Sequence, residues 1–382
     1  MMNMTGIQLT LLMGKFVPLP VAPWTAEALA SVDVTHSDSG PSTFQITFNA
    51  DRASALSTVD YPLLLQQTVA IGNRVIIIAT VGGFPHVLMD GLITHQELAH
   101  TRESGASTIS ATGEDISVAM DLNQIPMSYP GFGDEDIVAT IVAKYEMFGI
   151  IPTIIPTLSD VVTIPLEWVP QQNCTDRAYL KKLAAKHGYV VMVRPGPLPG
   201  TNTLYWGPPP RMMFPQSALT VDMGPATNVE QISFAYDGLA PELQLGVTQD
   251  DETELDIPIA TLVSTRMPPF ASEPAILFQF PFVRTALYND PRWDGIEALA
   301  WAQSQTDYSM DRVVTADGTV DTLRYNHVLE TPGTVGLRGA GYSYDGIYYV
   351  NSVKHTIARG SYRQTFQLSR EGLGSITPVV LP

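Results

Sequence analysis

Cysteine, basic residues and long hydrophobic runs are all scarce in this sequence of 382 residues. Cys174 is the only cysteine, so no intrachain disulfide can form, and we expect a buried, unreactive thiol. There are 21 Lys and Arg against 38 Asp and Glu, a net charge of −17, which argues against specific nucleic-acid binding. The apolar run at 75–79 has only the length of a strand, and the N-terminus lacks a basic stretch before its apolar residues. We therefore expect neither membrane insertion nor a signal peptide, and a protein made in the cytoplasm.

Turn-forming residues are abundant in this sequence, whereas charged residues are few. The sequence has 29 glycines and 30 prolines, while charged residues make up 15%, a composition typical of many short strands joined by turns. Residues 43–48 alternate apolar and polar side chains with the period of a half-buried strand. Further strands are expected at 73–80, 87–93 and 107–113, with a turn at Gly82-Gly83. Strands at this spacing predict that residues 1–113 form a first β-barrel domain.

The pattern changes near Gly113. Helices are predicted at 114–120, 134–148 and 175–188, followed by a strand at 189–193, and prolines at 208–210 end the unit. Residues 114–215 are thus predicted to form a small α/β domain.

The strand pattern returns in residues 216–382, which we predict to be a second β-barrel domain with an inserted helix. Its helix is expected at 295–305, with Ile296, Leu299 and Ala300 on one buried face. Its strands are expected at 229–236, 242–249, 334–338, 346–350, 353–358 and 364–369. The predicted fold class is mainly β with an α+β insert, in which two related β-barrel domains flank a small α/β domain.

The segment 175–189 predicts one capped amphipathic helix that runs into a strand. Thr175 or Asp176 is a suitable N-cap, and Gly188 is a suitable left-handed C-terminal residue. The expected buried stripe consists of Tyr179, Leu180, Leu183 and Ala184. The residues expected on the solvated side are Lys181, Lys182 and Lys186, with His187 in the last turn.

The amino-acid sequence of this segment resembles a motif of the phage late control D proteins, the baseplate hub family of contractile tails and related injection machines. Here it reads Asp176 to Tyr189, DRAYLKKLAAKHGY. Three other stretches resemble motifs of the same family in the same order. They are PSTFQITF at 41–48, SATGEDISVAMD at 110–121, and the hairpin and last strand between 339 and 370.

This resemblance implies a structural role in a baseplate, either in a virion or in a phage-tail-like particle. It implies a homotrimer whose paired barrels form a pseudo-sixfold ring that joins a hexameric tail tube to a trimeric spike. The expected partners are further copies of the chain, the tube protein, the spike protein and other baseplate proteins. No repetitive β-helix follows the last strand, so we expect the spike to be a separate chain.

None of the residue patterns that suggest chemistry fits a known site. His95 and His100 are five residues apart, whereas zincins need four, and Glu97 is misplaced beside them. His355 is expected to be structural, and the glycine-rich 336–341 lacks the helix of a phosphate loop. Residues 341–345 also lack the second glycine of a nucleophile elbow.

Two clusters leave alternatives open. Five acids between 250 and 256 could bind a divalent cation, although a solvated turn is preferred; they are Asp250, Asp251, Glu252, Glu254 and Asp256. Three aromatic residues could bind sugars, although a core or subunit contact is preferred; they are Trp168, Tyr205 and Trp206. We predict no catalytic, cofactor-binding or metal-binding residue, and no enzyme. The alternatives are a tail-associated cell-wall hydrolase and a carbohydrate-binding module.

Overall fold

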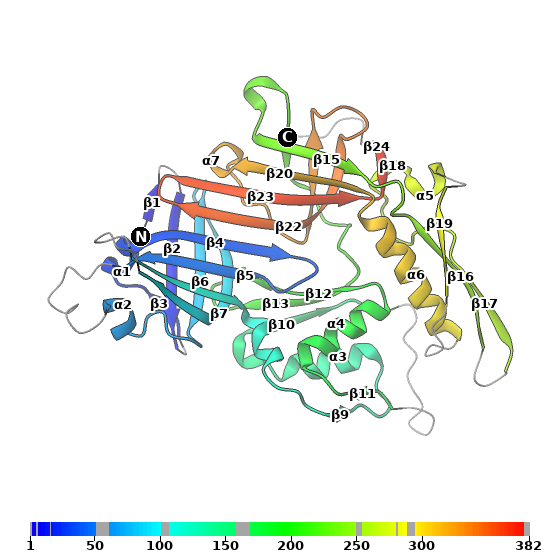
Figure 1. Cartoon of the computed structure of the whole chain (residues 1–382), viewed down its shortest axis with the longest axis horizontal. Coiled ribbons are helices and arrows are strands. Elements are labelled where there is room, and N and C mark those ends of the chain that lie inside the picture. Colours follow the sequence, from blue (N-terminus) through cyan, green and yellow to red (C-terminus); the bar gives the residue numbers. More distant parts are fainter. Residues whose placement is uncertain are drawn as a thin grey trace.

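The structure is a computed structural model, and it is mainly β, with 47% strand and 21% helix, as the sequence predicts. It describes residues 2–4, 7–15, 17–50, 61–100, 107–157, 169–249, 254–279, 282–288 and 295–377. Figure 1 shows a broad sheet on one side, a small α/β unit beneath it and a helix with separate strands at the far end.

A single 14-stranded sheet contains strands from both predicted β regions. Its first half follows the order β1 (Met2–Met4), β2 (Ile7–Gly14), β6 (Arg74–Val81), β7 (Phe84–Ala99), β8 (Thr108–Asp115), β5 (Thr43–Asn49) and β4 (Leu29–Ser37). Its second half continues with β22 (Gly346–Ala358), β23 (Ser361–Arg370), β20 (Val314–Asp321) and β15 (Val229–Tyr236). The other members are β3 (Leu19–Pro20), β14 (Gln216–Thr220) and β21 (Gly333–Arg338).

The two halves meet where β4 pairs antiparallel with β22, with Val34 opposite His355. Because this ladder is continuous, the two β regions share backbone hydrogen bonds and not only side-chain contacts. We call this 14-stranded assembly the main sheet.

Each half of the main sheet covers its own hydrophobic core. In β5 the buried residues alternate with exposed ones, and Phe44, Ile46 and Phe48 all point into the first core. In the second core, the ring of Phe366 lies over Gly318, where an added Cβ would come within 2.6 Å of that ring. A glycine is therefore required at 318 for the ring to pack this closely.

The α/β unit lies below the main sheet and has a third core. Its elements are β9 (Met127–Ser128), α3 (Asp134–Ala143), β10 (Ile150–Ile154), β11 (Gln171–Gln172), α4 (Asp176–Lys186), β12 (Val190–Pro195) and β13 (Asn202–Gly207). Two helix predictions need correction here. Residues 114 and 115 still belong to β8, and a 3₁₀ helix covers only Ile116–Asp121, because the Asp115 side chain caps the backbone amide of Ser117. The helix predicted at 134–148 ends at Ala143, and a separate 3₁₀ turn, Glu146–Phe148, ends at the left-handed Gly149.

A three-stranded sheet, separate from the one in the α/β unit (β10, β13 and β12), lies at the far end and is called the arm sheet. It has the order β17 (Asp256–Ala260), β16 (Glu242–Gln249) and β19 (Arg284–Leu287), and α6 (Gly295–Asp311) packs on it. Helix α6 is longer than predicted, and its predicted buried face is wrong. Ile296 and Leu299 are exposed, while the small Ala298 and Ala302 are buried against the sheet.

The remaining elements are short. They are α1 (Pro23–Ala28), α2 (Pro62–Leu65), a 3₁₀ turn at Gly224–Ala226, β18 (Ala271–Pro274), α5 (Ala275–Phe278), α7 (Thr322–Tyr325) and β24 (Gly372–Ser375). Two strand predictions, 229–236 and 242–249, are confirmed to the residue. The strands predicted at 346–350 and 353–358 are one strand, because a bulge at Asn351 lets β22 continue.

Candidate functional site

Helix α4 has the structure that its sequence predicts. The Thr175 side chain caps it by accepting a hydrogen bond from the Ala178 amide at 3.3 Å, and Gly188 follows it with a φ of +65°. The predicted apolar stripe is buried in the core of the α/β unit, against α3 and the 3₁₀ helix at 116–121. This packing fixes where the polar C-terminal end of α4 lies.

That end is an ion-pair cluster and not the solvated face that the sequence predicts. The Lys186 ammonium lies 3.0 Å from Asp134 and 2.5 Å from Glu297, and its side chain is only 10% exposed. His187 Nε2 lies 2.7 Å from Asp134. Burial alone would raise the pKa of Asp134, but the hydrogen bond from His187 and the charge of Lys186 outweigh it and lower that pKa. The cluster links α3, α4 and α6.

A second charged cluster lies beside it, between the arm and the main sheet. Arg211 pairs with Asp311 at 3.0 Å and with Glu371 at 2.9 Å, and Arg266 pairs with Asp311 at 3.0 Å. Arg266 also donates to the Gly188 carbonyl at the end of α4, at 2.9 Å. All of these side chains are at least 85% buried. Such buried charges need all their partners at once, so they fix the orientation of the segments that carry them.

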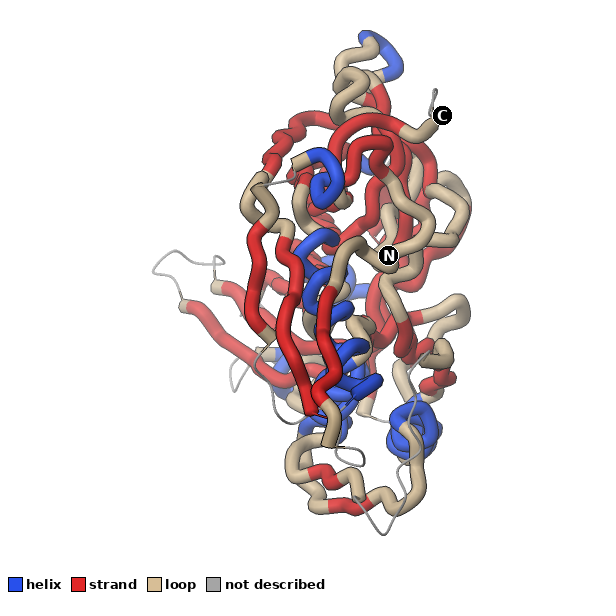
Figure 2. The backbone as a smooth tube through the Cα atoms, turned by 90° about the vertical axis from the view of Figure 1, so that its right-hand side faces the viewer, coloured by secondary structure: helices blue, strands red, loops and turns tan. Residues whose placement is uncertain are grey.

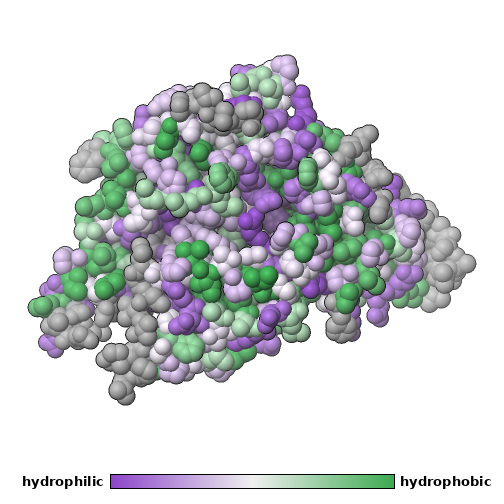
Figure 3. Space-filling view, turned by 180° about the vertical axis from the view of Figure 1, so that it is seen from behind, coloured by the Kyte–Doolittle hydropathy of each residue, from purple (hydrophilic) through white to green (hydrophobic). Residues whose placement is uncertain are grey.

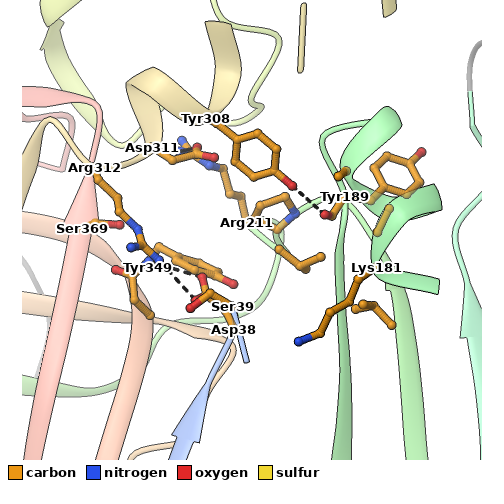
Figure 4. A pocket seen from close by; sticks show the side chains of 16 residues that line it. Asp38, Ser39, Lys181, Tyr189, Arg211, Tyr308, Asp311, Arg312, Tyr349 and Ser369 are labelled. Atoms are coloured by element: carbon orange, nitrogen blue, oxygen red, sulfur yellow. Dashed lines mark hydrogen bonds and ion pairs between the residues drawn. The ribbon is translucent and has the colours of Figure 1, made fainter. Parts of the chain in front are cut away.

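Between these clusters lies a cavity of about 330 Å³, shown in Figure 4. It is formed by the end of β4, the helices α4 and α6, and strands β12, β22 and β23. Arg312 lies 3.5 Å from Asp38, and the Asn351 amide donates to Asp38 at 3.3 Å. Burial raises the pKa of Asp38, and Arg312 only partly opposes this rise. The cavity thus marks the point where all three predicted regions meet.

The cavity is lined by charged, aromatic and small side chains. None of its lining residues is a histidine or a cysteine. Ser39, which lines it, pairs with the Ser37 hydroxyl at 3.0 Å. Within the described residues, no three His, Cys, Asp or Glu side chains lie where they could hold a metal ion. What the arrangement does is hold three regions in one relative position.

The first half of the main sheet is attached to the α/β unit by another buried ion pair. Arg74 of β6 pairs with Asp90 of β7 at 2.6 Å and donates to the carbonyls of Phe148 and Gly200. Asn202 of β13 donates to the same Asp90 at 2.9 Å. Sequence reasoning missed both this pair and the Arg211 cluster. The available signal was a charged residue inside an apolar strand, as with Asp90 between Met89 and Leu92.

The histidine predictions have separate outcomes. His95 and Glu97 are exposed residues of strand β7, and His100 follows the strand and pairs with the Tyr61 hydroxyl at 3.0 Å. His355 is buried in β22, where its Nδ1 lies 3.0 Å from the Tyr362 hydroxyl. This burial and pairing are what a structural histidine requires.

The other candidates are scattered. Trp206 is fully buried in the core of the α/β unit, as preferred, and the Tyr205 hydroxyl donates to the Pro208 carbonyl. Cys174 is half-buried, less than expected, because it lies in the turn that precedes α4. In the stretch 336–341 the first three residues belong to β21, and Gly339 and Gly341 have positive φ.

Two candidate groups are only partly described. Glu254 and Asp256 are exposed at the start of β17, as a solvated turn requires. Asp250, Asp251, Glu252 and Trp168 lie outside the described residues. Over the part of the chain that is described, no helix combines the length and apolar character needed to cross a bilayer.

Comparison with known proteins gives likeness of structure but not of sequence. No protein-family model and no curated protein matches the chain by sequence. A tail protein from Neisseria meningitidis is 15% identical with a TM-score of 0.65, over 97% of this chain and 98% of that one. The 43 kDa tail protein of prophage MuSo2 from Shewanella oneidensis is 13% identical with a TM-score of 0.64, over 96% and 98%. The fold is therefore that of phage tail proteins over nearly the full length.

A more particular likeness lies within that class. An E. coli component of the type VI secretion system, described as structurally similar to the T4 tail proteins gp27 and gp5, is 12% identical with a TM-score of 0.54. The match covers 93% of this chain and 77% of that one. At the level of the fold, these likenesses confirm the resemblance to tail proteins that the sequence motifs indicate.

Proposed function

We propose that this chain is a structural baseplate hub of a contractile tail, in a phage or a related injection system. The observation that carries the proposal is the match of fold along 97% of the chain to a tail protein of almost the same extent. The order of the four sequence motifs supports it independently.

In this role the chain forms a homotrimer that joins a hexameric tail tube to a trimeric spike. Residues 1–113 and 216–382 act as the two related β-barrel domains, and residues 114–215 act as the α/β domain between them. Three copies of a chain with two such domains present six similar units to the tube. The continuous ladder between β4 and β22 supports this role, because it holds the two units in a fixed relation.

The buried ion pairs favour a structural scaffold over an enzyme. Charge clusters at 134, 186 and 297 and at 211, 311 and 371 link separate regions, and the cavity between them is lined by neither histidine nor cysteine. The alternatives of cell-wall hydrolase and carbohydrate-binding module gain no support from the described side chains.

The mass of the purified full-length chain tests the proposal. We expect sedimentation and light scattering to give three times the chain mass of 41.6 kDa, and the trimer to co-purify with tube and spike proteins. Incubation with purified cell wall should release no fragments. A chain that stays monomeric up to high concentration and joins neither tube nor spike would rule out the hub role.

A further inference from the structure

The cavity between α4, α6 and the main sheet has two unlike walls. The wall formed by β22 and β23 is polar and includes Asn351 and Ser369. The wall formed by α4 and β12 is mostly apolar and includes Ala184 and Val191. Figure 4 shows Ser369 and Tyr189 on opposite sides of the space. A molecule that fills the cavity therefore meets polar groups on one side and apolar ones on the other.

Helix α6 connects this cavity to the arm. It contacts strand β16 of the arm sheet and also helix α4. Figure 2, which looks at the molecule from the arm end, shows helices behind the strands of the arm. Tyr308 and Asp311, near the end of α6, line the cavity. The cavity is therefore held between packed elements, as ligand sites in proteins usually are.

The cavity opens to solvent. Among its lining residues, Ser39 and Ala185 are exposed, and the side chain of Arg312 is 52% exposed. Elsewhere, the face seen from behind in Figure 3 mixes hydrophilic and hydrophobic residues without one continuous hydrophobic patch. The cavity is therefore a better candidate for binding another molecule than that face is.

Buried polar atoms in the lining have no hydrogen-bond partner among the described residues. They include Nε of Arg211, Oδ1 of Asn351 and Oγ of Ser369. These residues are only 6%, 4% and 1% exposed. An unpaired polar group at such depth costs stability, and most buried polar groups have a partner. A molecule in the cavity can supply the missing partners.

The three atoms specify what that molecule needs. Arg211 Nε only donates, whereas Asn351 Oδ1 only accepts, because the amide nitrogen of Asn351 already donates to Asp38. The Ser369 hydroxyl does both. The ligand therefore needs an acceptor and a donor at this wall, and a hydroxyl group combines the two.

Charge specifies the other end of the ligand. The cavity is lined by three basic residues, Lys181, Arg211 and Arg312, and by two acids, Asp38 and Asp311. Arg211 pairs with Asp311, and Arg312 lies 3.5 Å from Asp38. Lys181 has no ion pair within the described part of the chain, and Figure 4 shows it extending from α4 along the cavity. The excess of one positive charge fits one carboxylate.

We propose that the cavity binds a small organic acid that has a hydroxyl group, an apolar body and one carboxylate. The hydroxyl meets the polar wall of Asn351 and Ser369, the body packs on α4 and β12, and the carboxylate pairs with Lys181. The volume of about 330 Å³ is sufficient for such a molecule. Ordered water would satisfy the polar atoms but would also wet the apolar wall. This site is additional to the hub function and does not depend on it.

Titration calorimetry of the full-length chain with 4-hydroxybenzoate tests the carboxylate. Lys181→Met should weaken binding about tenfold, because it removes the ion pair. Lys182→Met is the matched control, since Lys182 is the next residue, is exposed and does not line the cavity. The neutral 4-hydroxybenzamide should bind the unmodified chain about tenfold more weakly and should bind the Lys181→Met variant equally well.

A second variant tests the polar wall. Ser369→Ala should weaken binding of 4-hydroxybenzoate about fivefold. Without ligand its melting temperature should be unchanged or higher, because the substitution removes an unpaired hydroxyl. Ser361→Ala, in the same strand but outside the cavity, is the control. Circular dichroism measures both melting temperatures.

Two results would overturn this site. If 4-hydroxybenzoate does not bind at millimolar concentration and Ser369→Ala lowers the melting temperature, the cavity holds only ordered water. If the acid binds but neither Lys181→Met nor Ser369→Ala weakens it, the acid binds elsewhere on the chain. The hub function is tested by the mass of the particle and stands in either case.

Discussion

The main sheet and the arm sheet use the same alternation of side chains with opposite results. In β5 of the main sheet the apolar residues Phe44, Ile46 and Phe48 are buried. In β16 of the arm sheet the buried positions are Gln244 and Thr248, and the residues between them, Leu245 and Val247, face solvent. Alternation therefore specifies a strand but not which of its faces the folded chain covers.

The covering layer decides the difference. The first half of the main sheet encloses a core of large side chains, whereas α6 offers the arm sheet small and polar ones, such as Ala298, Ala302 and Thr306. A layer of this kind packs closely against threonines and glutamine, and its larger apolar contacts are Ile259 and Tyr288. The apolar face is then available for contacts outside the chain.

The largest expected effect of a substitution lies in the main sheet. Phe366→Ala should lower the free energy of unfolding by about 4 kcal/mol, because it removes a buried ring and Gly318 cannot fill the space. Urea unfolding followed by fluorescence or circular dichroism measures it. A loss below about 1 kcal/mol would mean that the second core is loosely packed and that the contrast with the arm is weaker than described.

Lowering the pH should have an intermediate effect on the free energy of unfolding, through a histidine of the main sheet. Burial, followed by the nearby His36 and His86, lowers the pKa of His355 well below its usual range, so this side chain is neutral in the folded chain. The unfolded chain takes up a proton near pH 6.5. The contribution of His355 to the free energy of unfolding is therefore complete above pH 6.5. Below that pH it falls by about 1.4 kcal/mol per pH unit, or about 2 kcal/mol at pH 5.

The variant His355→Gln isolates this contribution. Its unfolding free energy, measured in urea at pH 7, 6 and 5, should change with pH less steeply than that of the unmodified chain by that amount. Equal slopes would show that His355 is protonated in the folded chain. No strand of the arm sheet contains a histidine, so the arm itself should not respond in this pH window.

The smallest effect should come from the arm. Leu287→Ala should change the unfolding free energy of the monomer by less than about 0.5 kcal/mol, because the side chain is already in water. Thermal unfolding at low protein concentration measures this value. A loss of 2 kcal/mol or more would mean that Leu287 belongs to an intrachain core, and the comparison between the sheets would fail.

Local features were predictable from the sequence, whereas contacts between residues far apart in the sequence were not. The helix at 176–186 was found correctly because its cap, apolar stripe and final glycine all lie within fifteen residues. The buried face of α6 was predicted wrongly because Ile296 and Leu299 are more hydrophobic than the alanines on the other face, which are the residues that are buried. Nothing in the sequence says that a helix buries its smaller side chains.

The candidate site shows the same limit. Lys186 was assigned to a solvated face because lysine near a helix C-terminus is usually exposed, yet Asp134 and Glu297 enclose it. These partners are 52 and 111 residues away, and no local pattern connects them. The cluster of Arg211, Asp311 and Glu371 was missed for the same reason.

The junction of β4 with β22 has a consequence for how the chain is made. Asp33 and Thr356, which share a hydrogen bond across this junction, are 323 residues apart. During synthesis the edge of β4 stays unpaired until β22 has been made, when almost the whole chain has left the ribosome. Contacts of such sequence separation slow folding and leave an unpaired strand edge available to other chains. Truncation before residue 346 should therefore yield a protein that aggregates through β4, however well its first hundred residues can fold.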